Sequence, residues 1–243
     1  MNLYVFITHQ LNLQTPFNWS NHLVRIWQYS FINKFSAVWI PDIQEEKNYA
    51  GILSNPIKKP VIPIWYMGAL ARLNRKEHTN PINKYTFLGL VSGPEPQRTL
   101  LENALWIQGN SKDIHFAVVA GRPLQQNLPQ YSKKGVLYPH ANGDDLADLI
   151  ASSEYIIFRG GYTSLMELIP FQKKLIIIPT PGQTEQVYLA KYWSDNGWAI
   201  SFDQSEFNLA LALEKASTTN FTQPAFLPFS IELLNEKMKE LNI

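Results

Sequence analysis

From residue 84 onward, short apolar runs alternate with segments of helical periodicity, and this alternation constrains the fold more than any other feature. The runs are rich in β-branched residues: YTFLGLVSG (85–93), IHFAVVAG (114–121), GVLYPH (135–140), EYIIFRG (154–160), KLIIIPT (174–180) and WAISF (198–202). Helical spacing marks 96–108, 144–153, 162–171, 184–196 and 205–217. Unbroken apolar runs suit strands buried on both faces, and strand–helix repetition favours a parallel sheet. The sequence therefore predicts a doubly wound, Rossmann-like α/β domain over 76–243.

Residues 1–75 have a different pattern and are expected to form a partial N-terminal α/β segment with a linker. Strands are expected at LYVFIT (3–8), SAVWIPD (36–42) and IWYMG (64–68), and an amphipathic helix over 19–33. The connector around the last strand, 52–83, contains four prolines, which cannot donate hydrogen bonds into a sheet. Because so small a unit cannot bury a core of its own, we expect it to pack on the larger domain or to be the tail of a domain whose beginning is absent.

Composition excludes several classes of protein. A formal net charge of +1 does not provide the basic face that nucleic-acid binding needs. The absence of cysteine excludes disulfides and thiol catalysis, and the five histidines lack the spacing of a metal site. No apolar stretch approaches the ~20 residues that cross a bilayer, and MNLYVFITHQ does not resemble a signal peptide. A cytoplasmic location is expected.

Four loops with unusual composition leave the strands of the larger domain at their carboxyl ends, where ligands bind in open parallel sheets. They are SGPEPQR (92–98), YPHANGDD (138–145), RGGYTS (159–164) and PTPGQTEQ (179–186). A helix is expected after each loop, and helix N-termini present free N–H groups that suit a phosphate or diphosphate. Neither GxxxxGK[ST] nor GxGxxG occurs, which disfavours ATP and NAD.

The third loop carries a glycine pair and a glutamate. Glu167 follows Gly160 by about two helical turns, where a carboxylate can accept hydrogen bonds from the vicinal hydroxyls of a ribose. The alternative is a solvent-facing glutamate near a helix start, favoured by the helix dipole alone. Gly160-Gly161 likewise indicates either close approach of a ligand or a tight turn without one.

In the fourth loop, Thr184 is expected to cap the helix that follows. This would leave Gln183, Glu185 and Gln186 at the mouth of the loop, and amides together with a carboxylate suit sugar hydroxyls, which need both donors and acceptors. An ordinary capped loop is the alternative.

The third and fourth loops together resemble the carboxy-terminal domain of the glycosyltransferases related to MurG (family 28). The family pattern is an S/F-R-x-G turn, a glutamate on the next helix, an apolar strand ending in proline and a glutamine-rich loop. The matching positions are Arg159, Gly161, Glu167, Pro179 and Gln186. The resemblance covers roughly 84–243, with linker similarity at 66–72. It implies the GT-B architecture of two Rossmann-like domains facing each other across a cleft, and a UDP-sugar donor, with a hexosamine such as GlcNAc.

The resemblance also implies roles for individual residues. Glu167 would hold the ribose of UDP, and Gln186 with Glu185 would face the donor sugar. The first glycine-rich loop would lie near the diphosphate, and 138–140 would lie where the family meets the uracil. The expected nucleotide-sugar-binding residues are Ser92, Gly93, Arg98, His140, Arg159, Gly160, Gly161, Thr163, Glu167, Gly182, Gln183, Thr184, Glu185 and Gln186.

The chain departs from the family pattern in two places within the larger domain. Pro94-Glu95-Pro96 stands where the family usually has Ser or Gln and a further Gly, which implies fewer diphosphate contacts there. Leu189 stands where the family often has Asn, so the identity of the sugar and of the acceptor is left open.

The implied function is an inverting glycosyltransferase that transfers a sugar from a UDP-sugar to a glycan or lipid-linked acceptor, as in cell-envelope polysaccharide synthesis. No cofactor and no obligatory metal are expected, because there is no DxD motif and Asp144-Asp145 is interpreted as helix-dipole compensation. No catalytic residue is assigned. His9, directly after the first strand, is a candidate general base, and a structural histidine is the alternative.

The amino-terminal domain of the family begins with a glycine-rich loop that is absent here, so 1–75 is interpreted as a remnant of that domain. Two other functions stay open: a donor-binding subunit completed by another polypeptide, and a UDP-sugar hydrolase. A split enzyme should leave a large apolar face on 1–75 exposed. Aromatic residues in this segment could contact a membrane at the inner face of the plasma membrane, a partner subunit, or simply the core. They are Trp19, Trp27, Tyr29, Phe31 and Phe35.

Overall fold

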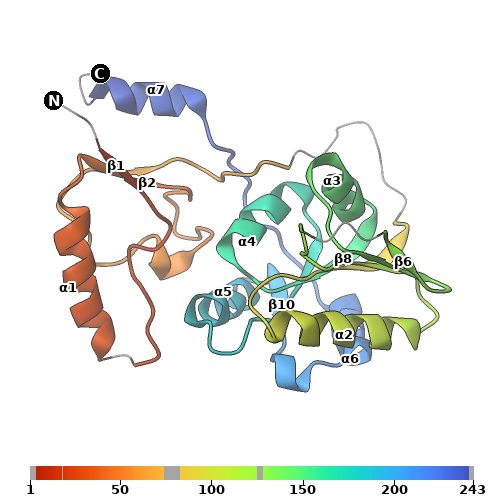
Figure 1. Cartoon of the computed structure of the whole chain (residues 1–243). Helices are drawn as coiled ribbons and strands as arrows, with labels where there is room; N and C mark the ends of the chain where they lie inside the picture. Colours follow the sequence, from red (N-terminus) through yellow and green to blue (C-terminus); the bar gives the residue numbers. More distant parts are fainter. Residues whose placement is uncertain (1–3, 18, 74–82, 125–127, 241–243) are drawn as a thin grey trace. The chain divides into compact units, whose positions relative to one another are not determined.

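The computed structural model describes residues 4–17, 19–73, 83–124 and 128–240 (Figure 1). The chain divides into two compact units, Met1–Ala71 with Pro224–Ile243, and Arg72–Gln223. The expected boundary at residue 75 thus falls close to the first division, but the last segment of the chain was not expected to join the first unit. It does so because Leu233 and Leu234, on helix α7 (Ile231–Glu240), pack beside Trp65 and Met67.

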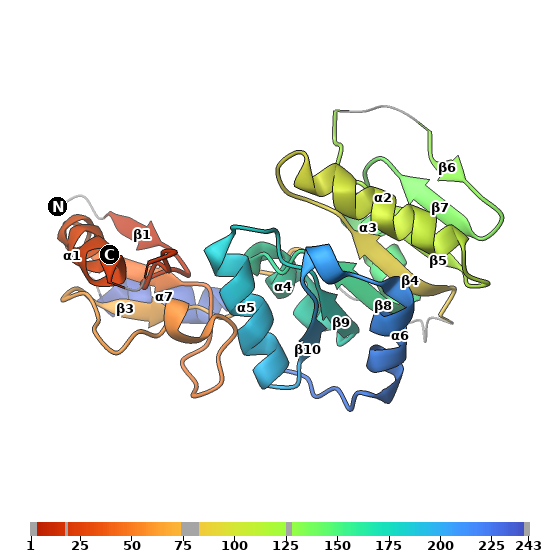
Figure 2. The ribbon, with the colours of Figure 1, turned by 90° about the horizontal axis from the view of Figure 1, so that it is seen from below.

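The second unit contains a seven-stranded sheet in the order β10-β9-β8-β4-β5-β7-β6, which can be followed in Figure 2. All pairs are parallel except β6 with β7. The strands are β4 (Tyr85–Leu90), β5 (Phe116–Val119), β6 (Gln130–Tyr131), β7 (Gly135–Tyr138), β8 (Ser153–Phe158), β9 (Lys174–Ile177) and β10 (Ala199–Ser201). The six expected strands and the doubly wound parallel sheet are confirmed. The two-residue β6 carries too little pattern to be foreseen.

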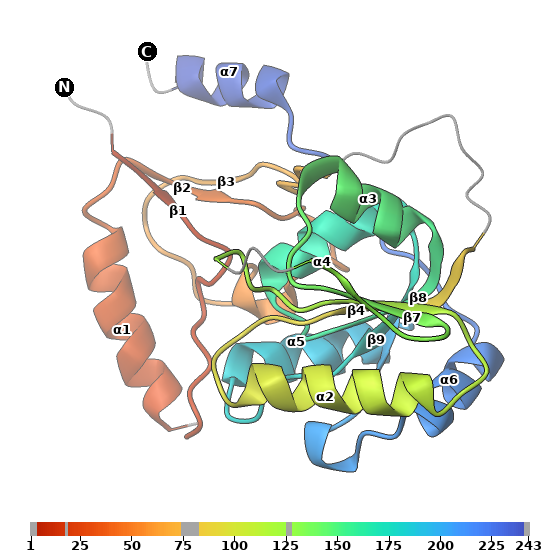
Figure 3. The same cartoon turned by 45° about the vertical axis from the view of Figure 1, so that its right-hand side comes forward.

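Helices connect these strands as the periodicity predicts. They are α2 (Gln97–Asn110), α3 (Gly143–Ala151), α4 (Tyr162–Leu168), α5 (Thr184–Asp195) and α6 (Leu209–Thr218). Figure 3 shows α2 and α6 together on one face of the sheet and α3 and α4 across it. The core between the sheet and α2 and α6 includes Phe87, Phe116, Leu105, Ile157 and Ala212, all fully buried. Gly197, with φ +74°, ends α5 as a left-handed glycine should.

The first unit is a three-stranded parallel sheet with one helix on each face. Its strands β1 (Val5–Ile7), β2 (Ala37–Ile40) and β3 (Ile64–Tyr66) lie in that order. Helix α1 (Ser20–Ile32) packs Ile32 on one face against Val38 and Ile40. A short 3-10 turn, Gly51–Leu53, lies between β2 and β3. None of the helices in the described ranges has the length and apolar character needed to cross a membrane.

Candidate functional site

The expected binding loops gather at the point where the sheet reverses its winding. The chain runs from β4 outward to β5 and β7, then returns to β8 on the other side of β4 and continues to β9 and β10. The loops after β4 and β8 therefore leave neighbouring strands in opposite directions, and such a switch point opens the crevice in which α/β sheets bind ligands. The loop after β9 lies next to them, because β8 pairs with β9.

Glycine occurs at positions 160 and 161, just after β8, for two different structural reasons. Gly160 has φ +76°, and a Cβ built on it would lie 2.5 Å from Cγ2 of Ile177 and 3.9 Å from the carbonyl oxygen of Gln186. A glycine is needed there because strand β9 and the start of α5 come so close. Around Gly161, by contrast, nothing lies within 4 Å of such a Cβ. The open space needed for a ligand is therefore beside Gly161, where Thr163 is also exposed.

Arg159 lies inside the second unit, with only 2% of its surface exposed. Its guanidinium donates to the Gln97 carbonyl, the Gln204 side chain and, at 3.4 Å, the Ile178 carbonyl. Burial lowers the pKa of this guanidinium to about 10. Arg159 thus links the tip of β8 to the start of α2 and to the 3-10 turn Gln204–Glu206, and its contact with a nucleotide sugar stays a prediction.

Glu167 is buried, and both of its carboxylate oxygens accept hydrogen bonds from the start of the unit. Oε1 accepts from Nε of Arg72 at 2.7 Å, while Oε2 accepts from the backbone N–H groups of Arg72 and Leu73 at 2.9 and 2.8 Å. The Arg72 side chain is 82% exposed, so the two backbone donors are the sheltered partners. The sequence indicated a ribose ligand or a solvent-facing residue, and neither interpretation foresaw this link to the chain before β4.

A buried ion cluster lies behind the first loop. The carboxylate of Glu102 accepts from Nη1 of Arg98 at 2.9 Å and from Nη2 of Arg122 at 2.5 and 2.6 Å. Arg98 also donates to Glu95 and to the Ala120 carbonyl. With Glu95 included, two guanidinium groups pair with two carboxylates, so the cluster fixes the geometry of the first loop and has no surplus positive charge. Arg122 was missed by sequence reasoning, although the Arg98–Glu102 spacing of four residues on a helix was visible.

Two residues of the first loop are exposed to solvent, and the hydroxyl of Thr180 beside them is buried. Ser92 and Gly93 are exposed, and Gly93 has φ +105°. A Cβ on Gly93 would lie 3.6 Å from Oγ1 of Thr180, a hydroxyl that is buried and has no hydrogen-bond partner among the described residues. The loops after β4 and β9 therefore meet across the tip of β8.

The fourth loop holds Gln186 in a defined orientation. Its Oε1 accepts from the backbone N–H of Thr180 at 2.8 Å, so its amide nitrogen remains as the group that can donate to a ligand. Gly182 has φ +82°, and both Gly182 and Gln183 are exposed. The expectation that Thr184 caps α5 is wrong: Gln183 is the N-cap residue, without a side-chain cap, because helical geometry already begins at Thr184. Thr184, Glu185 and Gln186 are half-buried in the first turn.

His140 lies farther along the same edge, after β7. It is exposed and lines a cavity of about 480 Å³ with Tyr85, Tyr138 and Asp145. Burial raises the pKa of the Tyr138 hydroxyl to about 12. The carbonyls of Tyr138 and Pro139 accept from the N–H groups of Ala120 and Arg122, so these backbone oxygens are already engaged. The uracil contact expected at 138–140 stays a prediction.

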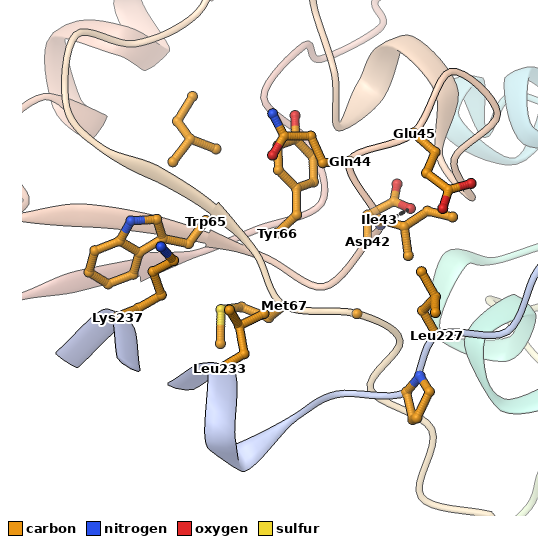
Figure 4. Close-up of a pocket in the computed structure, with 13 residues that line it drawn as sticks. Asp42, Ile43, Gln44, Glu45, Trp65, Tyr66, Met67, Leu227, Leu233 and Lys237 are labelled. Atoms are coloured by element: carbon orange, nitrogen blue, oxygen red, sulfur yellow. Dashed lines mark hydrogen bonds between the residues drawn. The ribbon is translucent and has the colours of Figure 1, made fainter. Parts of the chain in front are cut away.

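The first unit has a cavity of its own, of about 560 Å³, at the carboxyl ends of β2 and β3. Figure 4 shows Lys237 of α7 beside Trp65, with Gln44 and Glu45 on the loop that follows β2. Asp42 at its base is fully buried and accepts from the N–H groups of Ile43, Tyr49 and Ala50 and from the Ser54 hydroxyl. Burial raises the pKa of Asp42. This carboxylate therefore holds the loop together, and no sequence signal pointed to the cavity.

His9 follows β1 and is half-buried, with its Nε2 3.3 Å from Nε2 of Gln10. Its role as a general base stays a prediction. Within the described ranges no group of three or more His, Cys, Asp or Glu side chains is placed to hold a metal ion.

Comparison with known proteins identifies relatives of this chain. A model of the Glycosyltransferase family 28 C-terminal domain matches residues 95–228. A protein of Sulfurihydrogenibium sp., named UDP-N-acetylglucosamine–N-acetylmuramyl-(pentapeptide) pyrophosphoryl-undecaprenol N-acetylglucosamine transferase, is 27% identical over 156 residues, covering 63% of this chain and 42% of the relative. The protein with the same name from Thermosipho africanus is 29% identical over 174 residues, covering 68% and 50%. The chain spans half the length of these relatives or less.

Solved structures show the same fold at low sequence identity. MurG of Acinetobacter baumannii is similar with a TM-score of 0.52 at 15% identity, covering 87% of this chain and 57% of that one. The calicheamicin glycosyltransferase CalG4 has a TM-score of 0.54 at 10% identity, covering 88% and 59%.

Proposed function

The chain belongs to the family defined by the glycosyltransferase family 28 C-terminal domain, and on that premise we propose that it is a glycosyltransferase that uses a UDP-sugar. The donor is a UDP-hexosamine, UDP-GlcNAc, as the names of the two curated relatives state for those proteins. The acceptor is a glycan or a lipid-linked intermediate, and the sugar is transferred with inversion. The cytoplasmic location belongs to the same proposal.

The observation that carries this proposal is the meeting of the loops after β4, β8 and β9 at the switch point of the sheet. The open side of Gly161, the exposed Gly93 and the amide of Gln186 lie on these three loops. Arg98 and Arg122 lie behind the first of them and are held there by ion pairs with Glu95 and Glu102. The fourth loop leads into the start of α5, with Gln183 as its N-cap residue, and the N-terminus of a helix suits a diphosphate.

In the proposal, protein groups alone balance the diphosphate charge, so no metal is obligatory. Helix N-termini and guanidinium groups can stabilise a leaving diphosphate without a metal ion. Turnover in excess EDTA equal to turnover with Mg²⁺ would support this, and a strict requirement for Mg²⁺ would contradict it.

The test of the donor is calorimetric titration with UDP, UDP-GlcNAc, UDP-glucose and GDP. We expect UDP and UDP-GlcNAc to bind and GDP to bind at least 10-fold more weakly. Equal binding of GDP and UDP, or no binding of either, would contradict the proposal. Release of UDP should then be followed with and without a glycan acceptor, because release without any acceptor identifies a UDP-sugar hydrolase.

One observation favours a second candidate, a donor-binding subunit that another polypeptide completes. Large apolar side chains are exposed on the first unit, among them Trp19 and Trp27 at 73% and 71%. A subunit of this kind would bind UDP-GlcNAc without transferring the sugar alone.

A further inference from the structure

One face of helix α1 is apolar and uncovered in the described structure. Trp19, Leu23, Trp27 and Phe31 follow each other at intervals of four residues, and Ile26 lies beside them. We call these five residues the α1 stripe; each is about half to three-quarters exposed. Residues four apart lie on one side of a helix, so the stripe is continuous along α1.

The first unit packs the opposite side of α1 into its core. Gln28 and Ile32, on the opposite side, are the buried residues of α1. Ile32 joins the core, and Gln28 donates to the Gln10 carbonyl at 2.6 Å. A helix that needs only its inner side for packing usually has polar residues on its outer side. An apolar outer side of this size marks a surface that contacts something else.

The neighbouring strand β1 offers unpaired backbone groups. The N–H of Thr8 donates to the Trp39 carbonyl, and the carbonyl of Tyr4 accepts from the N–H of Ser36. The backbone groups of the even-numbered residues in and beside β1 therefore point toward β2. In a parallel pair the residues between them turn their N–H and C=O groups to the other side. Val5 and Ile7 therefore direct these groups away from β2, and the described part of the chain places no strand there.

Three aromatic rings join the edge of β1 to the α1 stripe. The ring of Phe6, on β1, lies 6.0 Å from that of Phe31 and 5.2 Å from that of Phe35, and the last two are 5.4 Å apart. The free edge and the stripe thus form one continuous surface, and a partner must meet two demands to bind it. It must place apolar groups on the stripe, and it must hydrogen-bond the free N–H and C=O groups of β1.

The charged residues on α1 and next to its end are basic. Residues 4–41 and 47–71 contain no Asp or Glu. Arg25 lies within α1, and Lys34 follows it. Lys58 and Lys59 are held near the end of α1, because the Tyr29 hydroxyl donates to the Lys58 carbonyl at 2.6 Å. A second copy of this chain would bring like charges together, whereas an acidic partner would be attracted.

Lipid would satisfy only one of the two demands. An anionic membrane would suit the stripe and the basic residues, but hydrocarbon cannot hydrogen-bond the free N–H and C=O groups of β1, and each unsatisfied group is costly. A polypeptide strand satisfies them and brings side chains over the stripe.

We propose that the α1 stripe and the free edge of β1 are one docking surface for a second polypeptide segment, which adds a β-strand to β1, covers the stripe with apolar side chains and places carboxylates near Arg25 and Lys34. The donor loops of the second unit take no part in this surface.

The probe is the amino-terminal half of the Sulfurihydrogenibium relative, fused by a Gly/Ser linker before the first residue of this chain. The linker raises the effective concentration of the probe to about millimolar. Hydrogen exchange of the Val5 and Ile7 amides is compared between the fusion and the unfused chain. We expect at least 10-fold slower exchange of both amides in the fusion, and weaker acrylamide quenching of tryptophan fluorescence.

Two variants test the geometry. Ile7→Pro removes one outward N–H but none of the groups that bond β2, and proline is tolerated at such an edge, so the variant should fold and lose the Val5 protection. Leu23→Glu/Trp27→Glu should also abolish it. The matched control, Leu100→Glu/Ile107→Glu, changes two exposed apolar residues on α2 and should leave the protection intact.

Three results would overturn the inference. One is equal exchange of the Val5 amide in the fusion and in its Ile7→Pro variant. The second is binding of the unfused chain to phosphatidylglycerol vesicles that Leu23→Glu/Trp27→Glu abolishes, since the occupant is then lipid. The third is a dimer of the unfused chain that the same variant dissociates, since the occupant is then a second copy. None of these measurements depends on UDP, so they are independent of the proposed donor specificity.

Discussion

Both carboxylate oxygens of Glu167 accept hydrogen bonds from Arg72, Oε1 from the guanidinium Nε at 2.7 Å and Oε2 from the backbone N–H at 2.9 Å. The N–H of Leu73 is a third donor. A carboxylate offers about four lone-pair positions, so one is left for a ribose hydroxyl unless the chain at Arg72 moves. Glu167 therefore has a structural role in addition to any role in binding the donor, and the two roles can be separated by substitution.

Replacing Glu167 by alanine should affect folding and ligand binding together. The change leaves the sheltered N–H groups of Arg72 and Leu73 without an acceptor, which should cost about 2 kcal/mol in the free energy of unfolding. Loss of a ribose contact should also weaken UDP binding about 10-fold at a temperature where the variant is folded. Urea unfolding and calorimetry measure the two effects, with Glu154→Ala, which removes a half-buried glutamate paired with Lys174, as control. Undiminished UDP affinity would leave Glu167 with the structural role alone.

Replacing Arg72 by alanine removes the guanidinium bond and keeps both backbone bonds. Because the Arg72 side chain is 82% exposed, we expect a loss of stability below about 1 kcal/mol. The UDP dissociation constant should stay within twofold of wild type, or fall, because Oε1 becomes free. A 10-fold loss of UDP affinity in Arg72→Ala would instead place the guanidinium itself in the donor site.

Regular alternation in the sequence was sufficient to predict the second unit. Buried strands such as β8 and β9 are unbroken apolar runs, and their order along the chain, with parallel crossovers, defines the sheet edge where the loops gather. The strand β6 was not predicted because two exposed residues carry no periodicity. Helix α7 was missed for another reason: its partners Trp65 and Met67 are distant in sequence, so no local pattern links it to the first unit.

The sequence located the candidate site but not the partners of its side chains. Arg159 and Glu167 were named for a ligand, yet their hydrogen bonds run to Gln97 and Arg72, residues far away along the chain. Such pairings depend on where separate loops meet in three dimensions. Arg122 follows β5 in an ordinary loop, and only the position of Glu102 gives it significance.

The two glycines at the tip of β8 should respond differently to alanine. At Gly160 a Cβ would lie 2.5 Å from Ile177 in a left-handed backbone conformation, so Gly160→Ala should lower the free energy of unfolding by about 2–4 kcal/mol. At Gly161 the space is open, so Gly161→Ala should change stability by less than about 1 kcal/mol. Its methyl group would occupy the space proposed for the donor and weaken UDP binding several-fold. Equal stability of the two variants would contradict this assignment.

Replacing Thr180 by valine tests whether the Thr180 hydroxyl, which lies behind Gly93, makes a hydrogen bond in solution. Thr180 is 1% exposed, and its Oγ1 has no hydrogen-bond partner among the described residues. Valine keeps the shape and removes an unsatisfied polar atom, so stability should stay equal or rise by about 1 kcal/mol. Thr180→Ser keeps the hydroxyl, loses the methyl group and should destabilise by about 1 kcal/mol. Thermal unfolding of both variants, with and without UDP, measures these differences. A loss above about 2 kcal/mol in Thr180→Val would mean that the hydroxyl is satisfied in solution, because only a bonded group costs that much to remove.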